Sequence, residues 1–105
     1  MTLRMIRRAQ IDSSDGALVR EWIADYTNAM RAHCPDSMEI TAWMQAYGEY
    51  GIAHWTFDAP DIATLDEFLS THGSHADVAE VLKRGSSLFM TGHTKDTLLK
   101  ELVLG

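Results

Sequence analysis

The chain has 105 residues, of which 46% are hydrophobic and 23% charged, and its nine basic and fifteen acidic side chains give a net charge of −6. This length predicts one domain spanning residues 1–105, and the ordinary apolar fraction excludes wholesale disorder. The acidic balance argues against non-specific nucleic-acid binding, which needs clustered Lys and Arg. The single cysteine, Cys34, excludes an internal disulfide and suits a reducing compartment. With no signal peptide and no run of about 20 apolar residues, we expect a cytoplasmic protein that does not enter membranes.

The first predicted elements are a strand and a helix. Residues Leu3 to Ile11 alternate in part, with one apolar parity broken by Arg7, and predict a strand. Asp12 to Asp15 offer several helix N-caps. Pro35 disfavours helical geometry at the preceding residue, so the helix should end near His33. Between these limits, spacings of three and four place six side chains on one helical face: Val19, Trp22, Ile23, Tyr26, Met30 and His33.

After Pro35, strict alternation predicts a hairpin of two strands, Met38 to Tyr47 and Tyr50 to Phe57, joined at Gly48-Glu49. A two-residue loop would place Trp43 opposite His54. One hairpin face is then fully apolar: Ile40, Ala42, Met44, Ala46, Ala53, Trp55 and Phe57. The other is mixed: Thr41, Trp43, Gln45, Tyr47, Tyr50, Ile52, His54 and Thr56. An odd-length loop would exchange the faces of the second strand.

The last third of the chain predicts a broken helix, a strand and a helical tail. Asp61 is the expected cap of the helix, Gly73-Ser74 interrupts it, and its second piece ends at Gly85. Ser86 to His93 is expected to be the fourth strand. A final helix is expected to start at Thr94, with its apolar side formed by Leu98, Leu99, Leu102 and Val103.

This order of elements predicts an α+β fold. Strand, helix, strand, strand, helix, strand is the ferredoxin-like βαββαβ order, with both helical layers on one face of a four-stranded antiparallel sheet. A C-terminal helix would complete it. The other face would leave Trp43, Tyr47, Tyr50 and Ile52 uncovered, which is costly in water. A second copy placed face to face would cover them, so we expect a homodimer that forms an α+β barrel.

The pattern resembles the dimeric α+β barrel superfamily, which includes antibiotic-biosynthesis-type monooxygenases and NIPSNAP-like proteins. The local likeness runs through the segment GIAHWTFDAPDIATLDEFL from Gly51, the broken helix, and the strand SLFMTG from Ser87. The resemblance implies a small-molecule pocket, with activities that range from cofactor-independent oxygenation to haem degradation and isomerisation. Haem-degrading members use an Asn, a Trp and a His; here the only asparagine, Asn28, is expected on a helix, which argues against haem.

Two locations for a ligand stay open. If the mixed face lines a cavity, His54 would move a proton and Tyr50 would orient it, with Trp43 beside the ligand. The alternative interpretation makes His54 a hydrogen-bonded interface residue. If the mixed face is only the dimer seam, the ligand should lie between helices and sheet, near Trp22, Tyr26 and Trp55. Core packing is the plainer explanation for these aromatic residues.

Three further groups have a plain and a functional interpretation. His72, a candidate ligand-binding residue, stands one helical turn from His75, a spacing that can chelate a metal. Gly73-Ser74 interrupts the helix there, so we expect solvated histidines and no metal. Cys34 has only His33 beside it, on a helix where neighbours point apart, so a catalytic thiol is not expected. The first strand's arginines would hold an anionic ligand or, as we prefer, lie solvated at an edge: Arg4, Arg7 and Arg8.

The functional expectation is therefore a small-molecule-binding, homodimeric α+β barrel protein that acts on an apolar organic molecule in the manner of a cofactor-independent monooxygenase. The alternative is a non-catalytic dimerisation or stress-related protein of the NIPSNAP-like type. Phosphate loops, serine-nucleophile elbows and paired zinc half-sites are missing from the sequence, so no cofactor is expected.

Overall fold

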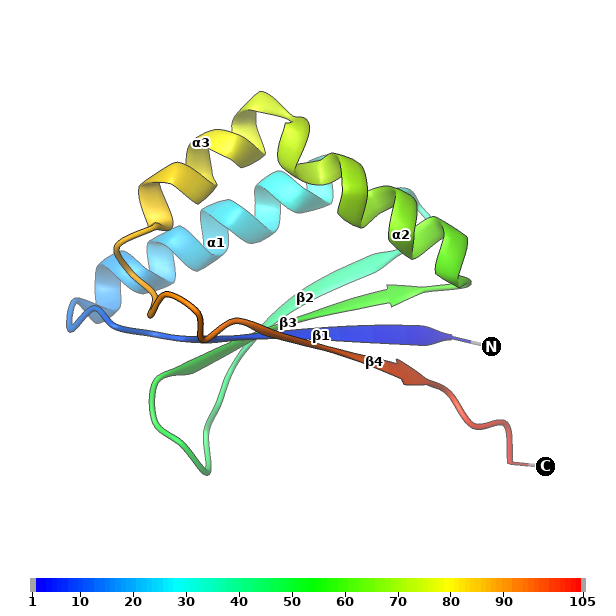
Figure 1. Ribbon diagram of the computed structural model, residues 1–105, viewed down its shortest axis with the longest axis horizontal. Helices are drawn as coiled ribbons and strands as arrows, with labels where there is room; N and C mark the ends of the chain where they lie inside the picture. The colour runs from blue at the N-terminus through cyan, green and yellow to red at the C-terminus, as the bar shows by residue number, and fades with distance from the viewer. Residues whose placement is uncertain (1, 105) are drawn as a thin grey trace.

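The computed structural model describes residues 2–104. Its sheet contains β1 (Leu3–Gln10), β2 (Glu39–Met44), β3 (Ile52–Ala59) and β4 (Lys95–Lys100), in the antiparallel order β2-β3-β1-β4. The helices α1, α2 and α3 lie on one side of this sheet and leave the other side uncovered (Figure 1). The fold is thus α+β and ferredoxin-like, as the order of elements predicts. No helix within residues 2–104 has the length and apolar character needed to cross a membrane.

The helices begin and end where local chemistry places their caps. The Asp15 carboxylate accepts a hydrogen bond from the Leu18 amide at 3.1 Å and starts α1 (Gly16–Ala32). The Asp61 carboxylate accepts one from the Thr64 amide at 2.8 Å and starts α2 (Ile62–Thr71). A 3-10 turn, η1 (His72–Ser74), separates α2 from α3 (Ala76–Gly85). The capping residues and the interrupted helix are as the sequence predicts.

The register of the β2–β3 hairpin is also confirmed, but its loop is longer than expected. Trp43 pairs with His54, as predicted. The strands separate after Met44, and residues 45–51 form the connection, in which Gly48 and Gly51 have φ values of +93° and +76°. These left-handed conformations favour glycine. The loop projects from the sheet on the side away from the helices (Figure 1).

The C-terminal part of the prediction is wrong. Residues 86–93 make only an isolated bridge, Ile11 to Phe89, and the fourth strand is Lys95–Lys100. The expected helix from Thr94 is absent within the described chain, and residues 101–104 have no regular structure. β4 forms because the free edge of β1 offers it six residue pairs, including Arg7 with Asp96. Backbone pairing along an edge outweighs the helical spacing of four leucine and valine residues.

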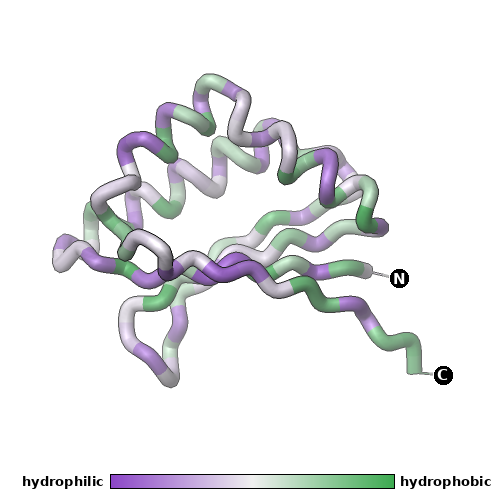
Figure 2. The backbone as a smooth tube through the Cα atoms, in the orientation of Figure 1, coloured by the Kyte–Doolittle hydropathy of each residue, from purple (hydrophilic) through white to green (hydrophobic). Residues whose placement is uncertain are grey.

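The core lies between the helices and the apolar face of the sheet. Side chains under 2% exposed come from both layers, among them Met30 of α1, Phe57 of β3 and Val78 of α3. Hydrophobic positions recur along the strands and along the helices above them (Figure 2). After β4 the chain is apolar and exposed, with Leu102, Val103 and Leu104 between 77% and 89% accessible. The apolar side chains between the helices and the sheet are therefore buried, whereas those that follow β4 remain exposed.

Candidate functional site

A pocket of about 330 Å³, open to solvent, lies between α1, the end of α3 and the sheet, and we call it the aromatic pocket. Its walls include the rings of Trp22 and Tyr26 from α1, Trp55 from β3 and Phe89 from the segment before β4. Small-molecule sites are commonly cavities of this size, apolar in lining, with a few polar groups. The pocket therefore has the size and lining of a ligand site.

Helical spacing brings the two α1 rings together. Trp22 and Tyr26 stand four residues apart and stack, with ring centroids 4.9 Å apart. Trp55 meets both edge-on, at 6.2 Å from Trp22 and 5.6 Å from Tyr26. Phe89 closes the group at 5.0 Å from Trp22. Such edge-on and stacked pairs hold each other's orientation, so the pocket wall is preformed.

The indole nitrogens of the wall are satisfied inside the protein. Trp22 Nε1 donates a hydrogen bond to the Val81 carbonyl at 2.6 Å, and Trp55 Nε1 donates to Thr27 Oγ1 at 3.2 Å. A ligand would consequently meet the carbon surfaces of these rings rather than their N–H groups. The walls supply apolar contact, and polar recognition must come from elsewhere in the pocket.

Arg7 and Asp96 supply that polar end. Arg7 Nε and Nη2 donate to the two Asp96 carboxylate oxygens at 2.9 and 3.1 Å. The guanidinium carbon also lies 5.8 Å from the ring centroid of Phe57. Burial raises the pKa of Tyr26, whereas the neighbouring Arg7 charge opposes that change. The Asp96 hydrogen bond raises the pKa of Arg7, which keeps the guanidinium charged.

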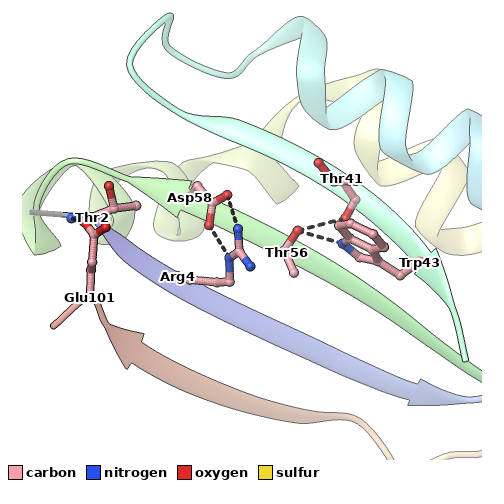
Figure 3. Close-up of polar contacts among 7 residues, drawn as sticks. All are labelled: Thr2, Arg4, Thr41, Trp43, Thr56, Asp58 and Glu101. Atoms are coloured by element: carbon pink, nitrogen blue, oxygen red, sulfur yellow. Dashed lines mark hydrogen bonds and ion pairs between the residues drawn. The ribbon is translucent and has the colours of Figure 1, made fainter.

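The open face of the sheet holds the other expected residues, and it is more polar than predicted. Trp43, 53% exposed, donates from Nε1 to Thr56 Oγ1 at 2.9 Å. Arg4 and Asp58 form a two-pronged ion pair, with Nε to Oδ1 at 2.7 Å (Figure 3). Ile52, expected among the exposed residues, is 0% exposed. The 45–51 loop projects toward this side of the sheet (Figure 1), and its Tyr47 and Tyr50 are 94% and 97% exposed.

His54 and Tyr50 do not meet as a proton-transfer pair. His54 Nε2 hydrogen-bonds Gln45 Oε1 at 2.8 Å. Burial and the charge of Arg8 lower the pKa of His54, so the imidazole is neutral at pH 7. Tyr50 lies in the hairpin loop and is 97% exposed. Trp43 and His54 are cross-strand neighbours on the open face.

His72 lies in the core rather than in the aromatic pocket. It is 7% exposed and stacks on Phe68, with centroids 5.0 Å apart. Its Nδ1 faces the Phe68 and Leu69 carbonyls at 3.3 and 3.1 Å, so that nitrogen carries the hydrogen. Burial lowers the pKa of His72. These contacts hold the junction between α2 and α3.

The second histidine of the pair points elsewhere. His75 stacks on His33 of the α1 cap with a centroid distance of 3.6 Å, and His33 Nε2 contacts Asp77 Oδ1 at 2.8 Å. His72 and His75 therefore have separate partners and do not form a chelating pair. Within residues 2–104, no group of three or more His, Cys, Asp or Glu side chains is arranged to hold a metal ion.

A second hollow lies along the free edge of β2, beside α1. It measures about 500 Å³ and is lined in part by Arg20, Arg31, Trp43 and Met44. Arg31 Nε donates to the Ile40 carbonyl at 2.8 Å, which covers part of the strand edge. Trp43 and Met44 are about half exposed, so this hollow is a surface groove without the buried, interlocked walls of the aromatic pocket.

The sequence identified three of the pocket's aromatic residues but missed its other members. The sequence predicts Phe89 in a strand and Asp96 in a helix, so it places neither residue in the pocket. The preferred interpretation of Arg7 from the sequence is a solvated charge at the edge of the sheet. The sequence does contain one signal for Arg7. It lies on the same face of β1 as Met5 and Ala9, which are both buried under the helices. A charge on the core-facing parity of a strand is a candidate for the polar end of an internal site.

Comparison with solved structures identifies the fold. Atu4242 of Agrobacterium tumefaciens, described as a NIPSNAP family protein with unknown function, superposes with a TM-score of 0.79 at 9% identity over 95% of this chain and 87% of that one. A NIPSNAP domain protein of Burkholderia xenovorans gives 0.73 at 13% identity over 100% and 98%. Rv0793 of Mycobacterium tuberculosis gives 0.67 at 17% identity over 99% and 98%.

The chain thus shares the fold of these NIPSNAP family structures, and the expected resemblance is confirmed for the fold. No protein-family model matches the sequence, and no curated protein matches it. Function must accordingly be argued from the residues of this chain.

Proposed function

We propose that this protein binds a small, largely apolar organic molecule in the aromatic pocket. The observation that carries the proposal is the preformed wall of Trp22, Trp55 and Phe89 around a cavity of about 330 Å³. Both indole N–H groups are internally bonded, so the parts of these rings that line the pocket present carbon atoms and favour an apolar, planar guest. His54 and Tyr50 lie outside this pocket, so the proposal is binding, with proton transfer at those residues not required.

The test uses 1-anilinonaphthalene-8-sulfonate, whose fluorescence rises in apolar sites. Leu82 lines the pocket and is 39% exposed, so Leu82→Trp should fill the cavity without disturbing the core. Leu18, 47% exposed on α1, is the matched control. We expect saturable binding of one dye per chain that Leu82→Trp abolishes and Leu18→Trp preserves. Equal binding by both variants would reject the pocket as the site.

We further propose that two copies associate through the open face, on which Trp43 and Leu99 are 53% and 47% exposed. The ion pairs on this face would be shared with, or covered by, the second sheet.

The expected oxygenase-like chemistry is tested with an oxygen electrode. Substrate-dependent oxygen uptake that is lost in His54→Ala supports a role for His54 in this chemistry, and uptake that is unaffected by the change excludes such a role. The free thiol of Cys34 supports a cytoplasmic location.

A further inference from the structure

The aromatic pocket carries a selective polar feature as well as an apolar wall. Among the described residues that line it, Arg7 and Asp96 are the charged ones. Arg7 lies on the core-facing parity of β1, beneath the helices, and its side chain is 22% exposed. A permanent cation in an apolar cavity is costly unless its charge and its donors are engaged. Its placement therefore calls for an anionic partner.

Asp96 engages only part of that cation. A guanidinium has five N–H donors in a fixed fork, and the Asp96 pair uses two of them, on Nε and Nη2. The Tyr26 oxygen is a further hydrogen-bond partner of the guanidinium, and the remaining donors are left for another acceptor. Asp96 is the more accessible partner, at 44% side-chain exposure, and it belongs to an edge strand whose residues are all exposed. A carboxylate that is partly exposed to water on such a strand can be displaced from its ion pair at a moderate cost in free energy.

Tyr26 adds a second donor beside Arg7. The Tyr26 phenol is 3% exposed and close enough to Arg7 for the two groups to alter each other's pKa. Because its pKa is raised, the phenol keeps its proton and can donate a hydrogen bond. A carboxylate at this point would accept from both the guanidinium and the phenol, while its ring lies against Trp22 and Trp55.

We propose that the ligand of the aromatic pocket is a small aromatic carboxylic acid, bound as its carboxylate by Arg7 and Tyr26 in competition with Asp96. This inference rests on the proposed function, because it names the class of molecule that the pocket binds. Arginine is suited to the role because its planar fork matches both carboxylate oxygens. Asp96 then acts as the resident counter-ion of the empty pocket.

The test compares 2-naphthylacetate with 2-naphthylacetamide by isothermal titration calorimetry on the full chain. The two probes share one ring system and differ in the charge of the head group. We expect the acid to bind at least tenfold more tightly than the amide. Arg7→Met should remove this preference, whereas Arg7→Lys, which keeps the charge but loses the fork, should retain part of it.

Asp96→Asn provides the opposite change. Removal of the competing carboxylate should tighten acid binding several-fold and leave amide binding nearly unchanged, and this holds even if Arg7→Met does not fold. Equal affinity of the acid and the amide for the unmodified protein, or weaker acid binding by Asp96→Asn, would overturn the inference and leave pocket binding intact. If neither probe binds while the anilinonaphthalene dye still binds in the pocket, the inference fails and the proposed function stands; if the dye does not bind either, both fail.

Discussion

Gly85 at the end of α3 limits the position of the Trp22 ring in the aromatic pocket. A Cβ atom built there would overlap the Trp22 indole well inside van der Waals contact, whereas one built on Gly73 would meet nothing within 4 Å. The same edge of the Trp22 indole is fixed by the hydrogen bond that Nε1 donates to the Val81 carbonyl of α3 at 2.6 Å. The glycine is therefore required by close packing of side chain on helix.

We predict that Gly85→Ala lowers the free energy of unfolding by about 1–3 kcal/mol, as overpacking in a filled core does. The gain in helix propensity is at most about 1 kcal/mol and does not compensate. Gly73→Ala, in open space, should change stability by less than about 0.5 kcal/mol. Urea unfolding of both variants measures the difference, and equal midpoints would contradict the contact.

His72 gives the protein a specific dependence on pH. Burial lowers its pKa in the folded state below the ordinary 6.5, so the unfolded chain takes up a proton first as the pH falls. Its contribution to stability is fully present above about pH 6.5 and declines below that value, until the folded-state pKa is reached. The physical cause is the poor solvation of a charged imidazole in the core, which favours the neutral ring.

We expect His72→Asn, which keeps a donor for the Phe68 and Leu69 carbonyls, to flatten the fall in melting temperature between pH 7.5 and pH 5. His93→Asn, at an exposed position, is the control and should retain the fall. An unchanged pH profile in His72→Asn would show that the histidine does not titrate between the two states.

At the scale of elements, the N-cap of α2 is a local and separable contribution. Asp61 accepts the Thr64 amide at 2.8 Å, and this hydrogen bond lowers the pKa of the Asp61 carboxyl. We predict that Asp61→Ala lowers the denaturant midpoint, while Asp61→Asn, which keeps an acceptor oxygen, lowers it much less. Denaturant midpoints at pH 7 measure both. A similar loss in the two variants would mean that the charge, rather than the acceptor, stabilises α2.

The elements differ in how well local sequence predicts them. α1 was predictable from its periodic apolar face, the Asp15 cap and Pro35, and the β2–β3 register followed from alternation. β4 was not, because six exposed residues form a strand only where the edge of β1 is available. Because the sequence predicts a helix from Thr94, it does not predict that Asp96 lines the aromatic pocket. Trp22 and Tyr26 were found because their spacing is local, whereas the Arg7–Asp96 pair joins residues 89 positions apart.

At the scale of the whole molecule, the uncovered sheet face predicts self-association. Leu99 on that face and Leu18 on α1 are both 47% exposed, which makes them a matched pair. We expect light scattering to give twice the chain mass of 11.8 kDa at micromolar concentration. Leu99→Arg should shift the protein toward monomer and Leu18→Arg should not. A monomer in the unmodified protein would reject association through this face.

We propose that the ligand lies beneath the helices of each chain and not between two sheets. A crystal structure of the protein soaked with 2-naphthylacetate tests it most directly. We predict that the naphthalene ring lies against Trp22, Trp55 and Phe89, with the carboxylate at Arg7. A ring bound on the open face beside Trp43 and His54, with the aromatic pocket empty, would contradict it.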